Sequence, residues 1–218
     1  MGFVEDFFNT LQLYNETFLP ITVLTYILGI IIVYLSFKKS KQSSQIASLL
    51  LGFLWIWSAI VFFFIYFGPM DIEFLGFTLP GVWYLGGVLY LYQGILFLFF
   101  GLVKPSLSFG LTWDTYSILG ITLVIYSMLI YPAIGFLTGL NYPRYPVFGA
   151  PCPLNIFTLG FLLTANRKTP LIIAVISFIW AIMGIMPILV LSVFADIGLI
   201  LSGVIGLPLI IIHNRRLG

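Results

Sequence analysis

Charged side chains are scarce in this sequence of 218 residues. Nine Lys and Arg and seven Asp and Glu make up 7% of the chain, whereas soluble domains contain about 25% charged residues. Apolar residues make up 61%, which is more than a soluble chain of this length can bury. The composition excludes a soluble enzyme, a secreted domain, a nucleic-acid-binding protein and a disordered chain. It predicts a protein of the lipid bilayer.

Cysteine and histidine are equally scarce, with one of each, Cys152 and His213. One cysteine excludes an intrachain disulfide and a Cys-rich metal site. One histidine near the C-terminal end gives no support to paired haem ligation, to a zinc site of the usual ligands or to a Ser–His pair. We therefore predict no metal, no cofactor and no enzymatic activity. An enzyme that uses Cys152 as its nucleophile is the weakest hypothesis, because the sequence identifies no base for it.

Long uncharged runs separate the clusters of charge. A membrane-spanning helix needs about 20 apolar residues, and helix is the expected structure because hydrocarbon offers no partner to backbone polar groups. Seven runs contain at least 18 uncharged residues: 17–37, 42–70, 74–103, 115–143, 145–166, 169–195 and 197–214. The sequence predicts an all-α membrane bundle with seven spans.

The basic residues predict the orientation, because Lys and Arg collect in cytoplasmic loops. With the N-terminus outside, eight of the nine basic residues fall on the inner side, and Arg144 is the exception. All acidic residues except Asp114 then fall outside. We predict a multi-pass protein of the cytoplasmic membrane with its N-terminus outside and its C-terminus in the cytoplasm.

Residues 1–16 are predicted to form a separate outer element. Apolar side chains recur there at spacings of three and four residues: Val4, Phe7, Phe8, Leu11 and Tyr14. This spacing is typical of an amphipathic helix, which we expect to lie along the outer membrane interface. Residues 17–218 are predicted to form a single seven-span transmembrane domain.

The fifth run differs from the others. Four prolines and Gly149 between residues 143 and 153 exclude helix before about residue 152. The remainder, 153–165, spans only ~20 Å as a helix, which is less than the ~30 Å hydrocarbon core. We predict that 145–152 enters the membrane as extended chain shielded by protein, and that a half-helix completes the crossing. The alternative is a plug on the outer surface followed by a short, tilted span.

The start of such a half-helix is a candidate binding site, because its free N–H groups attract anionic or electron-rich groups at mid-depth. Gln93, near the centre of the third predicted span, needs partners for its amide, and either a solute or a neighbouring helix would supply them. Asp196 precedes the last span, where an N-cap is favoured over a proton carrier. The predicted solute-binding residues are Gln93, Arg144, Cys152, Leu154, Asn155, Ile156 and Thr158.

Small residues recur along several spans. Gly87, Gly94 and Gly101 are spaced seven residues apart, and Gly198 and Gly206 lie on one face of the last span. Faces of small residues allow helices to approach closely in lipid. They predict tight packing, either within the chain or against partner helices.

Several motifs resemble a prokaryotic multi-pass membrane family, the domain of unknown function 6064. They are Tyr142-Pro-x-x-Pro-x-Phe-Gly-x-Pro-Cys-Pro-x-x-Ile-Phe-Thr-Leu-Gly, Tyr84-Leu-x-Gly with Gln93-Gly, Asn15-Glu16 and Asp196-x-Gly-Leu. The resemblance covers nearly the whole chain and implies a multi-pass membrane fold. It implies no activity, although some members are labelled as permeases.

Two functions fit these features. The first is a permease or channel-like carrier of a small polar or anionic solute, with the broken fifth segment as its site. The second is a non-catalytic membrane subunit or scaffold of a larger complex. The expected partners are the lipid bilayer, a small solute, and a second copy of the chain or a partner membrane subunit, but no nucleic acid.

Overall fold

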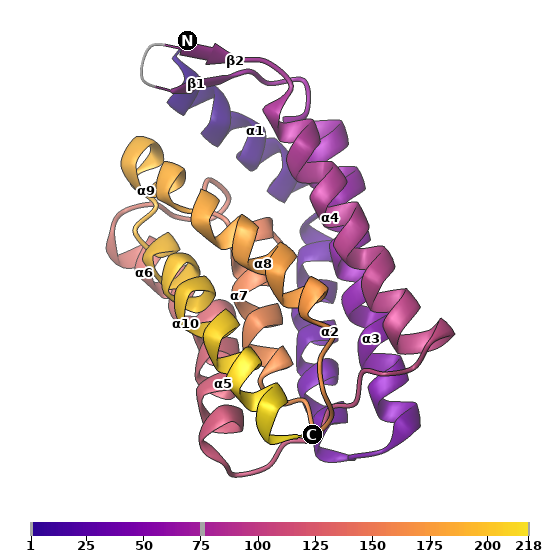
Figure 1. The fold of residues 1–218 in the computed structure, drawn as a ribbon. Helices are drawn as coiled ribbons and strands as arrows, with labels where there is room; N and C mark the ends of the chain where they lie inside the picture. Colours follow the sequence, from indigo (N-terminus) through magenta and orange to yellow (C-terminus); the bar gives the residue numbers. More distant parts are fainter. Residues whose placement is uncertain (1, 75–76, 218) are drawn as a thin grey trace.

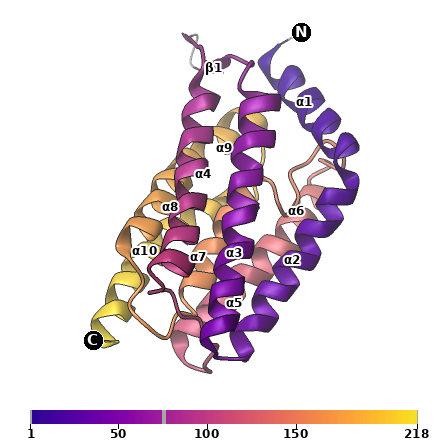
Figure 2. The same cartoon turned by 90° about the vertical axis from the view of Figure 1, so that its right-hand side faces the viewer.

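The chain forms a bundle of helices with a short β-hairpin at one end (Figures 1 and 2). The structure is a computed structural model and describes residues 2–74 and 77–217. Its elements are α1 (Phe3–Thr17), α2 (Leu19–Phe37), α3 (Lys41–Trp57), η1 (Ser58–Phe67), β1 (Ile72–Phe74), β2 (Phe77–Leu79), α4 (Val82–Leu98), η2 (Phe99–Val103), α5 (Thr115–Ile125), η3 (Tyr126–Ile130), α6 (Tyr131–Leu137), α7 (Pro151–Leu162), α8 (Leu171–Met183), α9 (Ile185–Leu191) and α10 (Asp196–Arg216).

Among the described residues, six helices are long and apolar enough to cross a membrane, which indicates a membrane protein. They are Leu19–Phe37, Lys41–Phe67, Val82–Val103, Thr115–Leu137, Leu171–Leu191 and Asp196–Arg216. They coincide with six of the seven uncharged runs, and for these six runs the prediction of a long apolar helix is confirmed. The fifth run forms only the short helix α7. The seventh crossing and the orientation in the membrane stay predictions.

The described loops gather at two opposite ends of the bundle. At the end that holds the C-terminus, Leu111 N–H donates to Ser36 O at 3.0 Å, and His213 Nε2 lies 2.7 Å from Ala165 O. At the other end, Tyr142 OH donates to Asn15 O at 2.8 Å. Figure 1 shows the N-terminus at this second end. The eight basic residues expected in the cytoplasm belong to loops or helix ends at the C-terminal end, which fits the predicted charge asymmetry.

Arg144, the exception to that asymmetry, lies at the opposite end with an acidic partner. Its Nη2 lies 3.0 Å from Glu5 Oε2 on α1. Its guanidinium carbon lies 5.8 Å from the centre of the Phe8 ring. The cation predicted to bind solute is therefore paired within the chain.

The helix α7 lies inside the bundle and packs against α5, α8 and α10. Eleven of its residues are buried and Cys152 is partly buried. The helix begins at Pro151, earlier than the predicted residue 153, because proline is tolerated in the first turn, where its missing N–H has no helical partner. It ends at Leu162 rather than near residue 165, so it is shorter than predicted.

Side chains of α1 and α2 satisfy the extended chain that precedes α7. Asn15 Nδ2 donates to Pro143 O at 2.6 Å and to Tyr145 O at 3.1 Å, and Thr25 Oγ1 donates to Phe148 O at 2.8 Å. Gly149 has φ +101°, a conformation that favours glycine. Irregular backbone at membrane depth requires such protein partners, and this segment has them.

The small-residue faces pack against other parts of this chain. A Cβ on Gly94 would lie 3.0 Å from Gly52 O of α3, and a Cβ on Gly160 would lie 2.6 Å from Gly120 O of α5. These glycines allow α4 to approach α3 and α7 to approach α5. The faces that could have served partner helices are thus used within the bundle.

One short hairpin departs from the all-α prediction. Strands β1 and β2 pair antiparallel, with Ile72 opposite Leu79. They lie in the linker between two long helices, where residues such as Ile and Thr favour strand over helix. The hairpin and α1 together cover the end of the bundle that holds the N-terminus (Figure 1).

Candidate functional site

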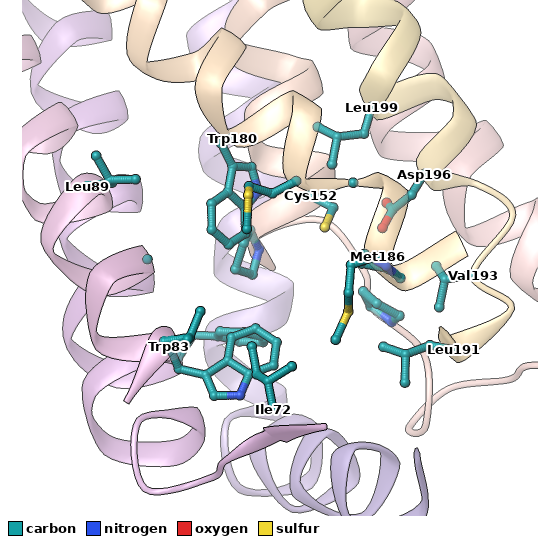
Figure 3. A pocket seen from close by; sticks show the side chains of 18 of the residues that line it. Ile72, Trp83, Leu89, Cys152, Trp180, Met186, Leu191, Val193, Asp196 and Leu199 are labelled. Atoms are coloured by element: carbon teal, nitrogen blue, oxygen red, sulfur yellow. The ribbon is translucent and has the colours of Figure 1, made fainter. Parts of the chain in front are cut away.

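A cavity of about 270 Å³ lies between α4, α8, α9 and α10, beside the start of α7. Figure 3 shows its wall, which is built from aromatic and aliphatic side chains. Phe7 of α1 and Ile72 of β1 line its outer end, so these two elements form its roof. An engineered cavity of about 150 Å³ lined by apolar side chains stays dry and binds benzene. This larger cavity is suited to an apolar ligand of about ten heavy atoms.

One buried carboxylate, that of Asp196, interrupts the apolar lining. Asp196 is only 1% exposed, and its Oδ1 accepts a hydrogen bond of 2.7 Å from Tyr131 OH. Its Oδ2 has no partner among the described residues. The N-cap of α10 is Ala195, and no side chain caps the helix. The N-cap interpretation of Asp196 is therefore wrong, because Tyr131 of α6 binds the side chain instead.

Cys152 and Trp180 lie beside this carboxylate. Figure 3 shows the Cys152 sulfur pointing toward the Asp196 carboxyl group, and Tyr131 and Trp180 also lie within reach of that sulfur. The Trp180 Nε1 is buried without a partner among the described residues. Asp196 Oδ2 and Trp180 Nε1 are both shielded from the cavity, and the Cys152 sulfur lies within reach of both side chains.

Aromatic packing fixes the wall on the α4 side. The Tyr90 ring lies 4.9 Å from the Trp180 ring, and Tyr90 OH donates to Pro151 O at 2.8 Å. The Trp83 ring lies 5.9 Å from the Phe7 ring of the roof. These contacts tie α4 to α8, to the start of α7 and to α1, so the cavity is held between packed elements.

The cavity opens sideways rather than along the bundle. Three of its lining residues are also exposed on the outer surface of α4 and α8: Leu85 at 66%, Ile179 at 43% and Met183 at 48%. In a membrane protein this apolar surface faces lipid. The cavity therefore reaches the apolar outer surface of the bundle between α4 and α8.

The polar residues predicted to bind solute form interhelical hydrogen bonds. Gln93 Nε2 donates to Ile173 O at 3.1 Å, and Asn155 Nδ2 donates to Ser177 O at 3.0 Å. Thr158 Oγ1 accepts from Trp55 Nε1 at 2.9 Å. Each side chain has 0% exposure. These bonds join α4 and α7 to α8, and α3 to α7, which is the structural alternative that the sequence left open for Gln93.

The remaining predicted residues divide between the core and the cavity. The Leu154 N–H, expected to be free, donates to Ala150 O at 3.1 Å, and Ile156 is fully buried in the core. Arg144 pairs with Glu5. Of the seven predicted residues, Cys152 is the one that lines the cavity described above.

The sequence analysis did not place Tyr131, Trp83, Trp180 or Asp196 in a binding site. One available signal was that Asp196 is the only charged residue between positions 169 and 214. An ionisable residue at the edge of a span is a functional candidate by default. The aromatic residues gave no such signal, because Trp and Tyr are common in apolar spans and at membrane interfaces.

The chain belongs to the Family of unknown function (DUF6064), whose model matches residues 4–218. The resemblance seen in the sequence motifs is thus confirmed over almost the whole chain. No curated protein and no solved structure matches it.

Proposed function

We propose that this protein is a multi-pass protein of the cytoplasmic membrane that binds a small, mostly apolar molecule and carries it between the lipid and its interior. The observation that supports this most is the cavity of about 270 Å³ that opens between α4 and α8. Its mouth lies on the apolar outer surface and its inner end holds Asp196. We propose no catalytic role, and Cys152 acts as a small lining residue.

The lining favours an apolar ligand over the polar or anionic solute expected from the sequence. Among the described lining residues Asp196 is the only Asp, Glu, Lys, Arg or His, so the lining offers no cation to bind an anion. Arg144, the cation expected near the site, is paired with Glu5. We still propose a carrier, but one whose ligand is apolar rather than polar or anionic.

The membrane orientation is part of the same proposal. With the N-terminal end outside, the basic loops face the cytoplasm, and the roof of α1 and the hairpin covers the outer end of the cavity. In this orientation, α7 and the extended segment before it together form a seventh crossing of the membrane. The mouth at Leu85 and Ile179 opens toward the lipid.

A scaffold function has less support. Gly52, Gly94, Gly120 and Gly160 pack within the chain, so the small-residue faces that suggested partner helices are occupied. A second copy or a partner subunit would have to bind the apolar surface that faces lipid.

Quenching of tryptophan fluorescence tests binding, because Trp83 and Trp180 line the cavity and bromine quenches indole emission at contact. Purified protein in detergent is titrated with 1-bromohexane. Leu89→Phe narrows the cavity, since Leu89 lines it, and Val88→Phe is the matched control, since Val88 is 57% exposed and points to the outside.

We expect saturable quenching in the wild type and in Val88→Phe, and an affinity at least tenfold weaker in Leu89→Phe. Quenching that rises linearly with probe concentration in all three proteins reports partition into detergent alone and would contradict the proposal. Circular dichroism of each variant checks that the helices are intact.

A further inference from the structure

We propose that this protein binds one anionic phospholipid at a second site, a groove between α2 and the helix formed by α5 and η3, with the lipid headgroup at Lys38. The groove has a volume of about 440 Å³. The described residues that line it are all different from those that line the cavity between α4 and α8. The site therefore goes beyond the proposed function, and each of the two can fail while the other stands.

The groove is apolar and open along one side. Its floor is formed by Val124 and Met128, which are 4% and 8% exposed. Ile30 of α2 and Leu129 of η3 form its edges and are 62% and 63% exposed. In a membrane protein such exposed apolar side chains face hydrocarbon. The acyl chain of a lipid can therefore lie in the groove without leaving the bilayer.

The dimensions of the groove fit an extended hydrocarbon chain. Along α2 the lining runs from Tyr26 to Phe37, which is about 16 Å at the helical rise. One leaflet of the hydrocarbon core is about 15 Å thick. The volume divided by this length gives a mean cross-section of about 27 Å², about a third of that of a helix with its side chains. An acyl chain fits in this space, whereas a partner helix does not.

The two ends of the groove differ chemically. At one end Tyr26 packs on the extended chain before α7: its ring lies 5.5 Å from the Phe148 ring, and its OH accepts from Phe148 N–H at 3.4 Å. At the other end Lys38 Nζ lies 5.0 Å from the centre of the Tyr34 ring, and Tyr34 lines the groove. A molecule with an apolar tail and an anionic head therefore fits in one direction, with its head at Lys38.

The charge at the Lys38 end favours an anionic headgroup. Lys38, Lys39 and Lys41 lie within four residues, and none of them forms an ion pair within the part of the chain that the structure describes. The carboxylate of Asp114, in the loop before α5, accepts hydrogen bonds from its own loop and from the first turn of α5. Clusters of basic residues next to a membrane span attract anionic lipids. A zwitterionic headgroup has no net charge and gains less from these lysines.

Native mass spectrometry of the full chain in detergent measures this binding. The protein is titrated with dipalmitoylphosphatidylglycerol, which is anionic, and with dipalmitoylphosphatidylcholine, which has the same acyl chains and no net charge. We expect the wild type to retain one phosphatidylglycerol molecule saturably, with an affinity at least fivefold higher than for phosphatidylcholine.

A charge reversal tests the headgroup end of the groove. Lys38→Glu is compared with Arg215→Glu, because both side chains are exposed and lie at the same end of the bundle, but Arg215 belongs to α10, which does not line the groove. Lys38→Glu should lower the affinity for phosphatidylglycerol at least tenfold and leave that for phosphatidylcholine within twofold. Arg215→Glu should stay within twofold of the wild type for both lipids.

A bulky substitution tests the acyl-chain part. Val33→Phe narrows the groove, since Val33 lines it. Ile31→Phe is the matched control, since Ile31 is 37% exposed on the same helix and does not line the groove. Val33→Phe should lower the affinity for both lipids at least fivefold, and Ile31→Phe should leave both within twofold. Circular dichroism checks that each variant keeps its helices.

Four results would overturn the inference. Equal affinities of the wild type for the two lipids, or equal losses in Lys38→Glu and Arg215→Glu, would show a general effect of charge at this end of the bundle. Unchanged lipid binding in Val33→Phe would place the lipid outside the groove. A dimer that is lost in Val33→Phe, with no lipid retained by the wild type, would identify a second copy of the chain as the occupant.

Discussion

The hydrogen bond from Tyr131 OH to Asp196 Oδ1 should be an important stabilising contact of the cavity. Both residues are buried, at 0% and 1% exposure, and the bond is 2.7 Å long. Tyr131→Phe removes the donor and leaves both carboxyl oxygens without a partner from the protein. A hydrogen bond between side chains contributes about 0.5–1.5 kcal/mol. We therefore expect Tyr131→Phe to lower the free energy of unfolding by about 1 kcal/mol.

A double-mutant cycle separates this bond from the packing of the ring. In an Asp196→Leu background the hydroxyl group of Tyr131 has no carboxylate to bind, so Tyr131→Phe should cost less than about 0.5 kcal/mol there. The coupling energy is then about 0.5 kcal/mol or more. Reversible unfolding in mixed micelles, followed by circular dichroism, measures all four proteins. An equal cost in the two backgrounds would show that the hydroxyl group does not act on Asp196.

Two further predictions concern the packing and capping of helices. A Cβ on Gly198 would overlap the Tyr126 ring, whereas a Cβ on Gly206 would meet its nearest atom at 3.7 Å. Gly198→Ala should therefore lower the free energy of unfolding by about 1–3 kcal/mol, and Gly206→Ala by less than about 0.5 kcal/mol. Equal costs for the two variants would contradict the close packing of Gly198 against Tyr126. Asp114 Oδ1 caps α5 by accepting from Ser117 N–H at 2.8 Å, so Asp114→Ala should cost about 1 kcal/mol at neutral pH. Burial acts to raise the pKa of Asp114, but its hydrogen bonds outweigh burial and lower the pKa below 3.8. The stability contributed by the cap is therefore present above pH 3.8 and is lost as the pH falls through the lowered pKa. Below that pH, the unfolding free energies of the wild type and of Asp114→Ala should become equal.

The spans were predictable because they depend on local composition. Long runs without charge can form only helices in hydrocarbon, and six of the seven runs do form long apolar helices. The proline block before residue 151 also predicted the non-helical segment. The exact start of α7 was missed, since Pro151 and Pro153 both fit within the first turn.

The site was not predictable, because it depends on residues that are distant in the sequence. Asp196 meets Tyr131 across 65 positions, and no local pattern predicts this contact. Gln93 and Asn155 have the polarity expected of a binding site, yet their partners are backbone carbonyls of α8. Polar side chains in a span need partners, and the sequence does not distinguish a helix from a ligand as the partner.

Arg144 illustrates the same limit for charge. Its predicted position on the outer side breaks the positive-inside pattern, and no sequence pattern explains this. The structure supplies one, because Glu5 lies 3.0 Å away on α1. The pair lies partly exposed at the surface, where such pairs contribute about 1 kcal/mol or less, so it neutralises charge more than it stabilises the fold.

The position of a bound brominated alkane tests the proposed binding site most directly. Crystals of the protein grown with 1-bromohexane locate the bromine by its anomalous scattering. We expect a bromine site inside the cavity, among the lining residues Leu85, Leu89 and Ile179. Bromine found only on the outer surface of the bundle would contradict the proposed function.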